Sequence, residues 1–191
     1  KGSFFLNIGD TYQDGNLLNI PHKVVIGLQD EGWILRNTII WKKRNPKPSS
    51  SKNNLCPSYE FIFHLVKSKK YYYKLTLTKS KDTDLLSRPI INRTVGQSSQ
   101  MHASPFVPRN GKNMGDYWEE DVVNTATANN VNLSNKLHPA PFPEKIVILP
   151  LLQTTKEKDL VLDPFHGTGT TGRVSIQYGR RYIGYDIKSY R

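Results

Sequence analysis

The sequence has only one cysteine, Cys56, among its 191 residues, and it has no long apolar run. A single thiol excludes an internal disulfide and argues against a zinc site built on cysteines. Apolar stretches such as residues 146–152 are far shorter than the roughly 20 residues that span a bilayer. The first residues show no signal-peptide pattern either. We therefore expect a cytoplasmic protein, associated with the nucleoid if it binds DNA, and no membrane partner.

Acidic residues are scarce, and the basic residues are clustered. Lys and Arg number 27 against 16 Asp and Glu, which gives a net charge of +11 and a pI of about 9.7. Residues 36–81 contain twelve basic side chains and a single acid, Glu60. A generally lysine-rich composition would spread this charge evenly, whereas clustering favours a surface that binds the phosphates of nucleic acid. The candidate contacts are Lys42, Lys43, Arg44, Lys47 and Lys52.

The order of apolar segments in the first two thirds predicts strands and one helix. Strands are expected at residues 3–8, 33–41 and 59–66, where apolar and β-prone side chains gather. A helix is expected at residues 21–32, with Pro near its start and Gly near its end. Residues 75–136 are polar and irregular, which predicts a functional or partly disordered insertion.

The last third has the order strand, glycine turn, helix, strand. A strand over residues 159–163 leads to a turn at Gly167 and Gly169, a helix over residues 170–178 and a second strand over residues 182–186. Such a βαβ unit implies parallel pairing with a right-handed crossover.

The glycine turn carries the strongest signal of a binding site. Its sequence is Asp-Pro-Phe-His-Gly-Thr-Gly-Thr, residues 163–170. Glycines let the backbone approach a ligand, and the following helix offers free N–H donors. Asp186, at the end of the next strand, can accept hydrogen bonds from both ribose hydroxyls of an adenosine ligand. A structural turn would explain the glycines alone, but the whole pattern predicts a nucleoside-type cofactor. The bulky Asp-Pro-Phe entry argues against a dinucleotide.

A proline-rich string, His-Pro-Ala-Pro-Phe-Pro-Glu, occupies residues 138–144. Its prolines force an extended approach to a helix that Pro143 opens, and Pro150 is expected to kink or shorten that helix. Taken alone, the string would be a rigid linker. His138 and His166 have no partners at metal-ligand spacing, so we expect satisfied or solvent-facing histidines and no metal site.

Together, the two strings resemble the amino-directed DNA methyltransferases, in the class whose cofactor motifs lie toward the C-terminal end. Earlier segments follow the order of the same family: Ser-Phe-Phe-Leu-Asn-Ile-Gly-Asp at residues 3–10, Ile-Pro-His-Lys at 20–23, a Trp-containing segment at 32–46 and Ser-Tyr-Glu-Phe at 58–61. The resemblance covers residues 1–79 and 138–188.

This resemblance implies an α/β fold, with a doubly wound, mostly parallel sheet of the class I methyltransferase (Rossmann-like) type, here incomplete. Residues 1–79 would form the catalytic half of the sheet, residues 80–137 an inserted target-recognition region, and residues 138–191 the cofactor-binding portion. The implied activity is methylation of adenine N6 or cytosine N4 in double-stranded DNA, in a restriction–modification system. Arg109 and Asn113 of the recognition region would contribute to base choice.

The resemblance also implies S-adenosylmethionine as cofactor. Asp186 would hold the ribose, the glycine turn would line the pocket, and residues 138–142 would pack beside the methionine half. The cofactor-binding residues so implied are His138, Pro139, Ala140, Pro141, Phe142, Asp163, Phe165, Gly167, Thr168, Gly169, Thr170 and Asp186.

One family motif is absent from the sequence: the catalytic tetrapeptide of Asp, Asn or Ser, two prolines and an aromatic residue. In the family it binds the target amino group and stacks on the flipped base. No catalytic residue is therefore assigned, and we expect a fragment or one subunit of a split protein, with the motif upstream or on a second chain. A non-catalytic DNA- and cofactor-binding subunit stays open. A nicotinamide-dependent oxidoreductase would explain neither the charge nor residues 138–144.

Overall fold

The computed structural model describes residues 2–43, 46, 50, 52–78, 112–118 and 143–187. It divides into two compact units, Lys1–Lys74 with Gly115–Arg191, and Leu75–Met114. In the second unit, β6 (Leu77–Thr78) pairs antiparallel with β7 (Lys112–Asn113). The elements that carry the predicted sites, apart from Asn113, belong to the first unit.

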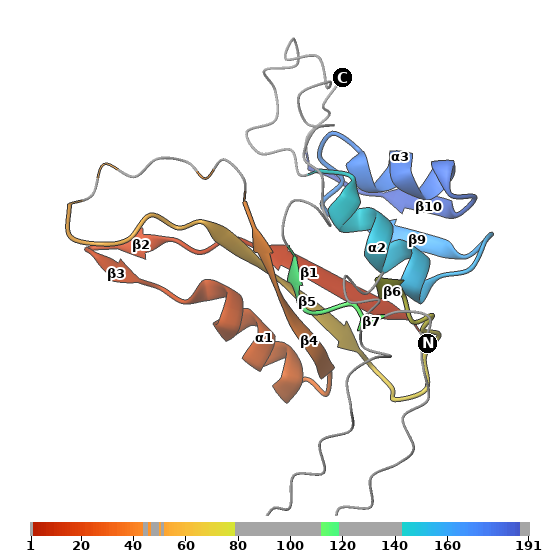
Figure 1. Ribbon diagram of the computed structural model, residues 1–191, viewed down its shortest axis with the longest axis horizontal. Helices are drawn as coiled ribbons and strands as arrows, with labels where there is room; N and C mark the ends of the chain where they lie inside the picture. Colours follow the sequence, from red (N-terminus) through yellow and green to blue (C-terminus); the bar gives the residue numbers. More distant parts are fainter. Residues whose placement is uncertain are drawn as a thin grey trace, which may run out of the picture. The chain divides into compact units, whose positions relative to one another are not determined.

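The N-terminal part of the first unit is a four-stranded sheet with the order β1-β5-β4-β8 (Figure 1). Its strands are β1 (Ser3–Ile8), β5 (Tyr59–Val66), β4 (Ile34–Lys42) and β8 (Tyr117–Trp118). The central strand β5 pairs antiparallel with both β1 and β4, and β8 joins β4 in parallel. The three strands predicted in the first 66 residues are thus confirmed. A short hairpin of β2 (Tyr12–Gln13) and β3 (Asn16–Leu17) follows β1.

The hydrophobic core of this sheet lies between β5 and the helix α1 (Ile20–Asp30). Phe63 and Leu65 of β5 are fully buried against Val25 of α1. The helix has a proline in its first turn, and Gly32 lies just beyond its end with a φ of 81°, a conformation that glycine adopts without strain. The helix predicted at residues 21–32 is therefore confirmed.

Residues 115–118, which we expected within the irregular insertion, take part in this sheet. Trp118 is buried, and its indole N–H donates to the carbonyl of Gly115 at 3.1 Å. The backbone N–H of Ile40 in β4 bonds the carbonyl of Asp116 at 2.8 Å. A pair of aromatic residues in a polar stretch was too short a signal to predict a strand. The role of residues 80–137 in target recognition stays a prediction.

The C-terminal part contains α2 (Lys145–Thr154), β9 (Leu160–Asp163), α3 (Thr170–Gln177) and β10 (Arg181–Gly184). Strands β9 and β10 pair in parallel, as predicted for a βαβ unit. In Figure 1 the two helices lie in front of these strands. The ring of Tyr182 in β10 lies against Gly172 of α3, where an added Cβ would come within 2.6 Å of it.

No helix of the described ranges covers the other face of the β9–β10 pair. Leu160, Leu162 and Ile183 lie on it with 50%, 59% and 40% of their surface exposed. Parallel sheets are normally covered on both faces by helices. This half of the unit therefore shows an apolar surface that a complete α/β sheet would bury.

Helix α2 continues through Pro150 to Thr154, so Pro150 does not end the helix, and the expected kink stays a prediction. Proline removes one backbone hydrogen bond and crowds the preceding turn. Here Pro150 and Leu151 are both buried, and this packing offsets the lost bond. The next turn is also reinforced, since the hydroxyl of Thr154 donates to the carbonyl of Pro150 at 2.7 Å. None of the helices in the described ranges is long and apolar enough to cross a membrane.

Candidate functional site

The glycine turn connects β9 to α3 in a conformation that depends on two glycines. Gly167 and Gly169 have φ values of 52° and 80°, in the left-handed region that residues with a Cβ avoid. Gly169 is the N-cap of α3, so the first backbone N–H groups of that helix lie at the turn. These groups have no partner within the helix and carry the positive end of its dipole. The turn therefore suits an electron-rich ligand.

The entry to the turn is tied to the segment that follows β10. The Asp163 carboxylate accepts the N–H of Phe165 at 2.9 Å, and the Asp163 carbonyl accepts the N–H of Tyr185 at 2.9 Å. The N–H of His166 donates in turn to the carbonyl of Tyr185 at 2.8 Å. Asp163 thus stabilises the conformation of the turn. The turn and the segment after β10 are joined by hydrogen bonds into one layer.

Asp186 reaches the turn, while its role as the ribose acceptor stays a prediction. Its carboxylate accepts the N–H of Gly167 at 2.7 Å, although 19 positions separate the two residues. A carboxylate accepts several hydrogen bonds at once, so this bond is compatible with acceptance from ribose hydroxyls. Phe165, the other predicted contact in the entry, has 82% of its surface exposed and so offers an apolar ring beside the turn.

The far side of the turn is held by Arg173 of α3. Its guanidinium donates to the carbonyl of Thr168 at 2.8 Å and to the hydroxyl of Thr170 at 3.3 Å. The same side chain lies 3.6 Å from a carboxylate oxygen of Glu144. Glu144 is the last residue of the proline-rich string, so the end of that string lies beside the turn. His138, Pro139, Ala140, Pro141 and Phe142 lie outside the described residues.

The sequence analysis gave no role to Tyr182 and Gly184, and it expected His166 only to be a satisfied or solvent-facing histidine. The Nδ1 atom of His166 lies 2.7 Å from the hydroxyl of Tyr182. Burial, with the nearby Asp163 carboxylate, raises the pKa of Tyr182 to about 12, so its phenol stays protonated at neutral pH. Gly184 was the one sequence signal for this packing, because a glycine within a strand often marks a point where another group approaches the backbone closely.

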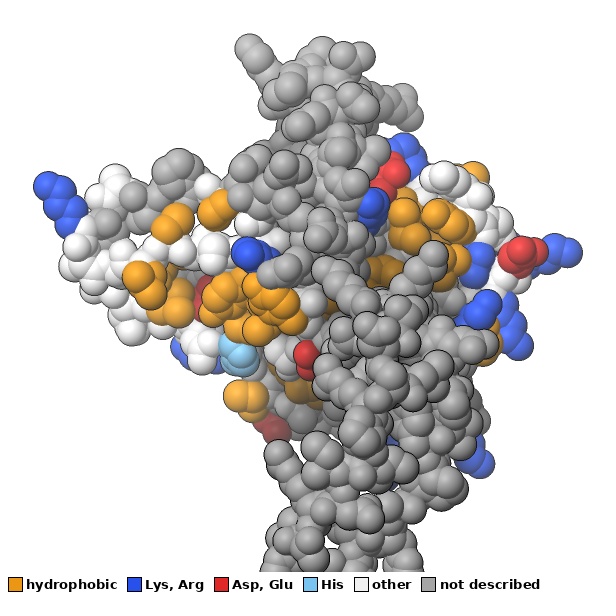
Figure 2. Space-filling model, viewed as in Figure 1, with side chains coloured by type: hydrophobic (Ala, Val, Ile, Leu, Met, Phe, Trp, Pro, Cys, Tyr) orange, Lys and Arg blue, Asp and Glu red, His pale blue; other side chains and the backbone are white. Residues whose placement is uncertain are grey.

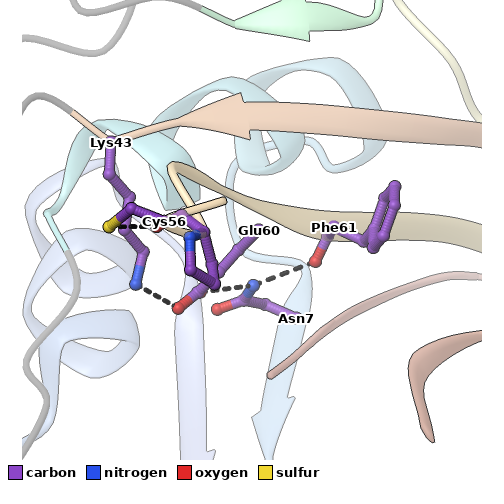
Figure 3. Close-up of polar contacts among 6 residues, drawn as sticks. Asn7, Lys43, Cys56, Glu60 and Phe61 are labelled. Carbon is purple, nitrogen blue, oxygen red and sulfur yellow. Dashed lines mark hydrogen bonds and ion pairs between the residues drawn. The ribbon is translucent and has the colours of Figure 1, made fainter. Parts of the chain in front are cut away.

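Among the predicted DNA contacts, Lys43 is engaged in an ion pair with Glu60 (Figure 3). Its Nζ atom also lies 5.7 Å from the centroid of the Trp41 ring. Asn7 of β1 holds the carboxylate from the other side, donating to Glu60 at 3.1 Å and to the carbonyl of Phe61 at 3.0 Å. The single acid of the basic stretch therefore compensates the charge of Lys43.

The remaining predicted DNA contacts are dispersed. Lys42 at the end of β4 and Lys52 are exposed. Asn113 lies in β7 of the second unit, while Arg44, Lys47 and Arg109 fall outside the part of the chain that the structure describes. On the face shown in Figure 2, the described Lys and Arg side chains lie singly or in small groups. The assignment of these residues to DNA binding stays a prediction.

Comparisons with known proteins agree with the resemblance. A family model of N6/N4 type, described as DNA methylase, matches residues 1–191. The Type II methyltransferase M.Cfr9I of Citrobacter freundii is 30% identical over 216 residues, covering 97% of this chain and 61% of the relative. The Type II methyltransferase M2.LlaDCHI of Lactococcus lactis subsp. cremoris is 32% identical over 181 residues, covering 93% and 55%. The chain thus spans little more than half the length of these curated relatives.

Solved structures show the same fold. The PvuII DNA methyltransferase, described as cytosine-N4-specific, matches with a TM-score of 0.63 at 22% identity, over 98% of this chain and 60% of its own. The M1.HpyAVI–SAM complex matches with a TM-score of 0.55 at 16% identity, over 98% and 70%. The predicted methyltransferase-type α/β fold is therefore confirmed. In the described residues the four-stranded sheet is mixed, because β5 pairs antiparallel with β1 and β4 while β4 pairs in parallel with β8, and β9 and β10 form a separate parallel pair.

Proposed function

The chain belongs to the DNA methylase family, and on that basis we propose that it is the cofactor- and DNA-binding part of a site-specific DNA methyltransferase. The reaction is methyl transfer from S-adenosylmethionine to the exocyclic amino nitrogen of adenine or cytosine in duplex DNA, in a restriction–modification system. The observation that carries this proposal is the 2.7 Å bond from the N–H of Gly167 to Asp186. It joins the predicted ribose acceptor to the glycine turn at the N-terminus of α3.

The residues of the turn fit S-adenosylmethionine. Asp186 would accept from the ribose hydroxyls, the backbone at Gly167 and Gly169 would allow close approach, and the exposed Phe165 ring would offer an apolar contact. When bound, the cofactor supplies a reactive methyl group on a sulfonium. The protein therefore contributes mainly by positioning this group and by excluding water from it.

We further propose that the polypeptide with the catalytic tetrapeptide lies outside these 191 residues. Two observations support this: the sequence contains no such tetrapeptide, and the relatives are longer than this chain. The open face formed by Leu160, Leu162 and Ile183 gives that polypeptide an apolar surface to cover. A strand paired in parallel with β9 would end at the same sheet edge as Asp163, which is where ligands bind in open α/β sheets.

A second candidate function rests on the same missing motif. A non-catalytic DNA- and cofactor-binding subunit or relic would keep Asp186 and the turn, but it would depend on a partner chain for the whole of the chemistry. The two candidates differ in what happens when the missing motif is supplied.

One experiment tests both candidates. We expect the isolated chain to bind S-adenosylmethionine in calorimetry but to transfer no tritiated methyl group to duplex DNA. Transfer should appear when a polypeptide carrying the tetrapeptide is added in cis or in trans. Asp186→Ala should weaken cofactor binding by about 1.5–3 kcal/mol, the range for hydrogen bonds to a charged group. Asp186→Asn, which keeps one acceptor oxygen, should lose less.

Asp30→Ala is the matched control, because Asp30 is at the end of α1 and away from the turn. It should leave cofactor binding unchanged. Turnover by the isolated chain would show that the catalytic residues lie within it. Undiminished binding by Asp186→Ala would remove Asp186 from the site, and absence of transfer after complementation would favour the non-catalytic subunit.

A further inference from the structure

His166 lies within the glycine turn, and both its backbone and its side chain are engaged there. Its N–H donates to the carbonyl of Tyr185 at 2.8 Å, and its carbonyl accepts the N–H of Gly169 at 2.9 Å. Its ring lies beside that of Tyr182, with the centroids 5.6 Å apart and the Nδ1 atom 2.7 Å from the hydroxyl. The two groups share one hydrogen bond, and the tautomer of His166 sets which of them donates.

The His166 ring fills a space that two glycines leave open. A Cβ added at Gly184 would lie 2.4 Å from Nδ1 of His166 and 2.7 Å from the hydroxyl of Tyr182. A Cβ added at Gly169 would lie 2.9 Å from Cε1 of His166. Real Cβ atoms do not approach this closely, so the ring and a side chain at either position exclude each other. The two rings are therefore clamped between the start of α3 and the end of β10.

We propose that His166 is a positioning residue of the cofactor site, which acts through Tyr182 to hold the Gly167 N–H toward Asp186. This inference rests on the proposed function. Gly167 follows His166 directly, and glycines in the left-handed region are otherwise free to move. The hydrogen bond to Tyr182 fixes the ring, and the ring fixes the backbone on either side of it. The turn is thus preorganised before a cofactor arrives, which reduces the entropy lost on binding.

The first test separates this role from simple packing by a conservative rescue. His166→Ala removes the ring, and Tyr182→Phe removes the hydroxyl alone. Each should weaken binding of S-adenosylmethionine about three- to tenfold, the effect of one net hydrogen bond. His166→Asn places an amide oxygen near the position of Nδ1 and should restore most of the affinity. The double variant His166→Ala with Tyr182→Phe should lose no more than His166→Ala, because the two residues act as one unit.

A second test uses the clash itself. Gly184→Ala should weaken cofactor binding, since the new methyl group displaces the His166 ring; Gly184 has an ordinary φ, so backbone strain is not the cause. Adding both His166→Ala and Tyr182→Phe to Gly184→Ala should recover part of the binding, because the three atoms that the added Cβ would meet are then gone. A merely structural role predicts the opposite, with the losses adding.

Urea denaturation of each variant accompanies the titrations. The midpoints of Tyr182→Phe and His166→Asn should stay close to that of the wild type. Binding losses that follow the loss of stability, or equal affinities for His166→Asn and His166→Ala, would overturn the inference. If the wild type binds S-adenosylmethionine and His166→Ala binds it equally well, only the positioning role falls. A wild type that binds no S-adenosylmethionine would defeat the proposed function as well.

Discussion

The two halves of the first unit bury their apolar residues to very different extents. In the N-terminal half, Phe63, Leu65 and Val66 of β5 have at most 1% of their surface exposed. In the C-terminal half, Leu160 and Leu162 of β9 are at least half exposed. Both strands are rich in apolar residues, so the sequence alone does not distinguish them. The difference comes from their neighbours.

Strand β5 has a neighbour on each side and α1 on one face, all supplied by the first 66 residues. Among the described residues, strand β9 pairs only with β10 and has a helix on one face. Antiparallel neighbours can be joined by short connections, whereas parallel strands need crossovers and cover on both faces. The half with the glycine turn is therefore the half with exposed apolar strand residues, which the proposed complementary polypeptide would cover.

The largest expected effect tests this difference in burial directly. Phe63→Ala should lower the free energy of unfolding by about 3–5 kcal/mol, because it leaves a cavity in a closed core. Leu162→Ala should change it by no more than about 0.5 kcal/mol, as for a surface position. Urea denaturation of both variants measures the contrast. A large loss for Leu162→Ala in the isolated chain would show that its face is already covered. In the presence of the complementary polypeptide, Leu162→Ala should lower the free energy of unfolding, because the side chain is then buried.

The second prediction concerns acid, and it also depends on burial in the N-terminal half. His64 of β5 is 2% exposed, it stacks on Phe5 with the ring centroids 4.5 Å apart, and its Nε2 atom lies 3.0 Å from the hydroxyl of Ser3. Burial, with the nearby Arg36 guanidinium, lowers the pKa of His64 from 6.5 to about 4. The folded protein therefore holds this ring neutral where the unfolded chain protonates it.

Between pH 6.5 and about 4 the unfolded state binds more protons at this residue, so the free energy of unfolding falls as the pH falls. The contribution is complete above pH 6.5, and its loss amounts to at most about 3 kcal/mol. Thermal denaturation across this range should show the slope in the wild type. His64→Gln, which can still bond Ser3 but does not titrate, should flatten it. The control His22→Gln should keep it, and equal slopes for wild type and His64→Gln would contradict the assignment.

Features with a local cause were predictable from the sequence. The strands at residues 3–8 and 59–66 have a simple apolar pattern, and the glycine turn followed by Asp186 has a spacing that one βαβ unit dictates. These signals do not depend on distant parts of the chain. For the same reason the family resemblance was carried by short strings, and it predicted the fold before any contact was known.

Features with a tertiary cause were not predictable. Strand β8 exists because Trp118 is buried beside β4, and α2 passes Pro150 because that residue is buried. The Tyr182 hydroxyl that bonds His166 is 16 positions away in the sequence, and no spacing rule joins them. A bulge in β4 at Arg36, whose guanidinium donates to the hydroxyl of Tyr71 at 3.1 Å, had no local signal either.

The smallest expected effect compares the basic residues of the two halves. If the basic stretch faces phosphates, DNA affinity falls with salt at a log–log slope of roughly −0.9 per neutralised phosphate. Changing Lys42, Lys43 and Arg44 together to Ala should flatten this slope and weaken specific and nonspecific duplexes alike. A matched triple in the C-terminal half, with Lys145, Lys156 and Lys158 changed to Ala, removes the same charge and should leave the slope unchanged. Substitutions at Arg109 or Asn113 should instead reduce discrimination between duplexes, because base contacts carry specificity.

The ion pair between Lys43 and Glu60 sharpens this test. Glu60 already compensates the charge of Lys43. The triple variant should therefore flatten the salt slope by less than the value expected for three neutralised phosphates. Glu60→Gln removes the competing carboxylate while keeping an acceptor for Asn7. It should therefore steepen the slope by up to about 0.9, the value of one further phosphate. Titrations at several salt concentrations measure all three variants.

A slope that neither triple changes would show that the basic residues are a solvated surface. A slope that only the C-terminal triple flattens would place the DNA on the half that carries the glycine turn.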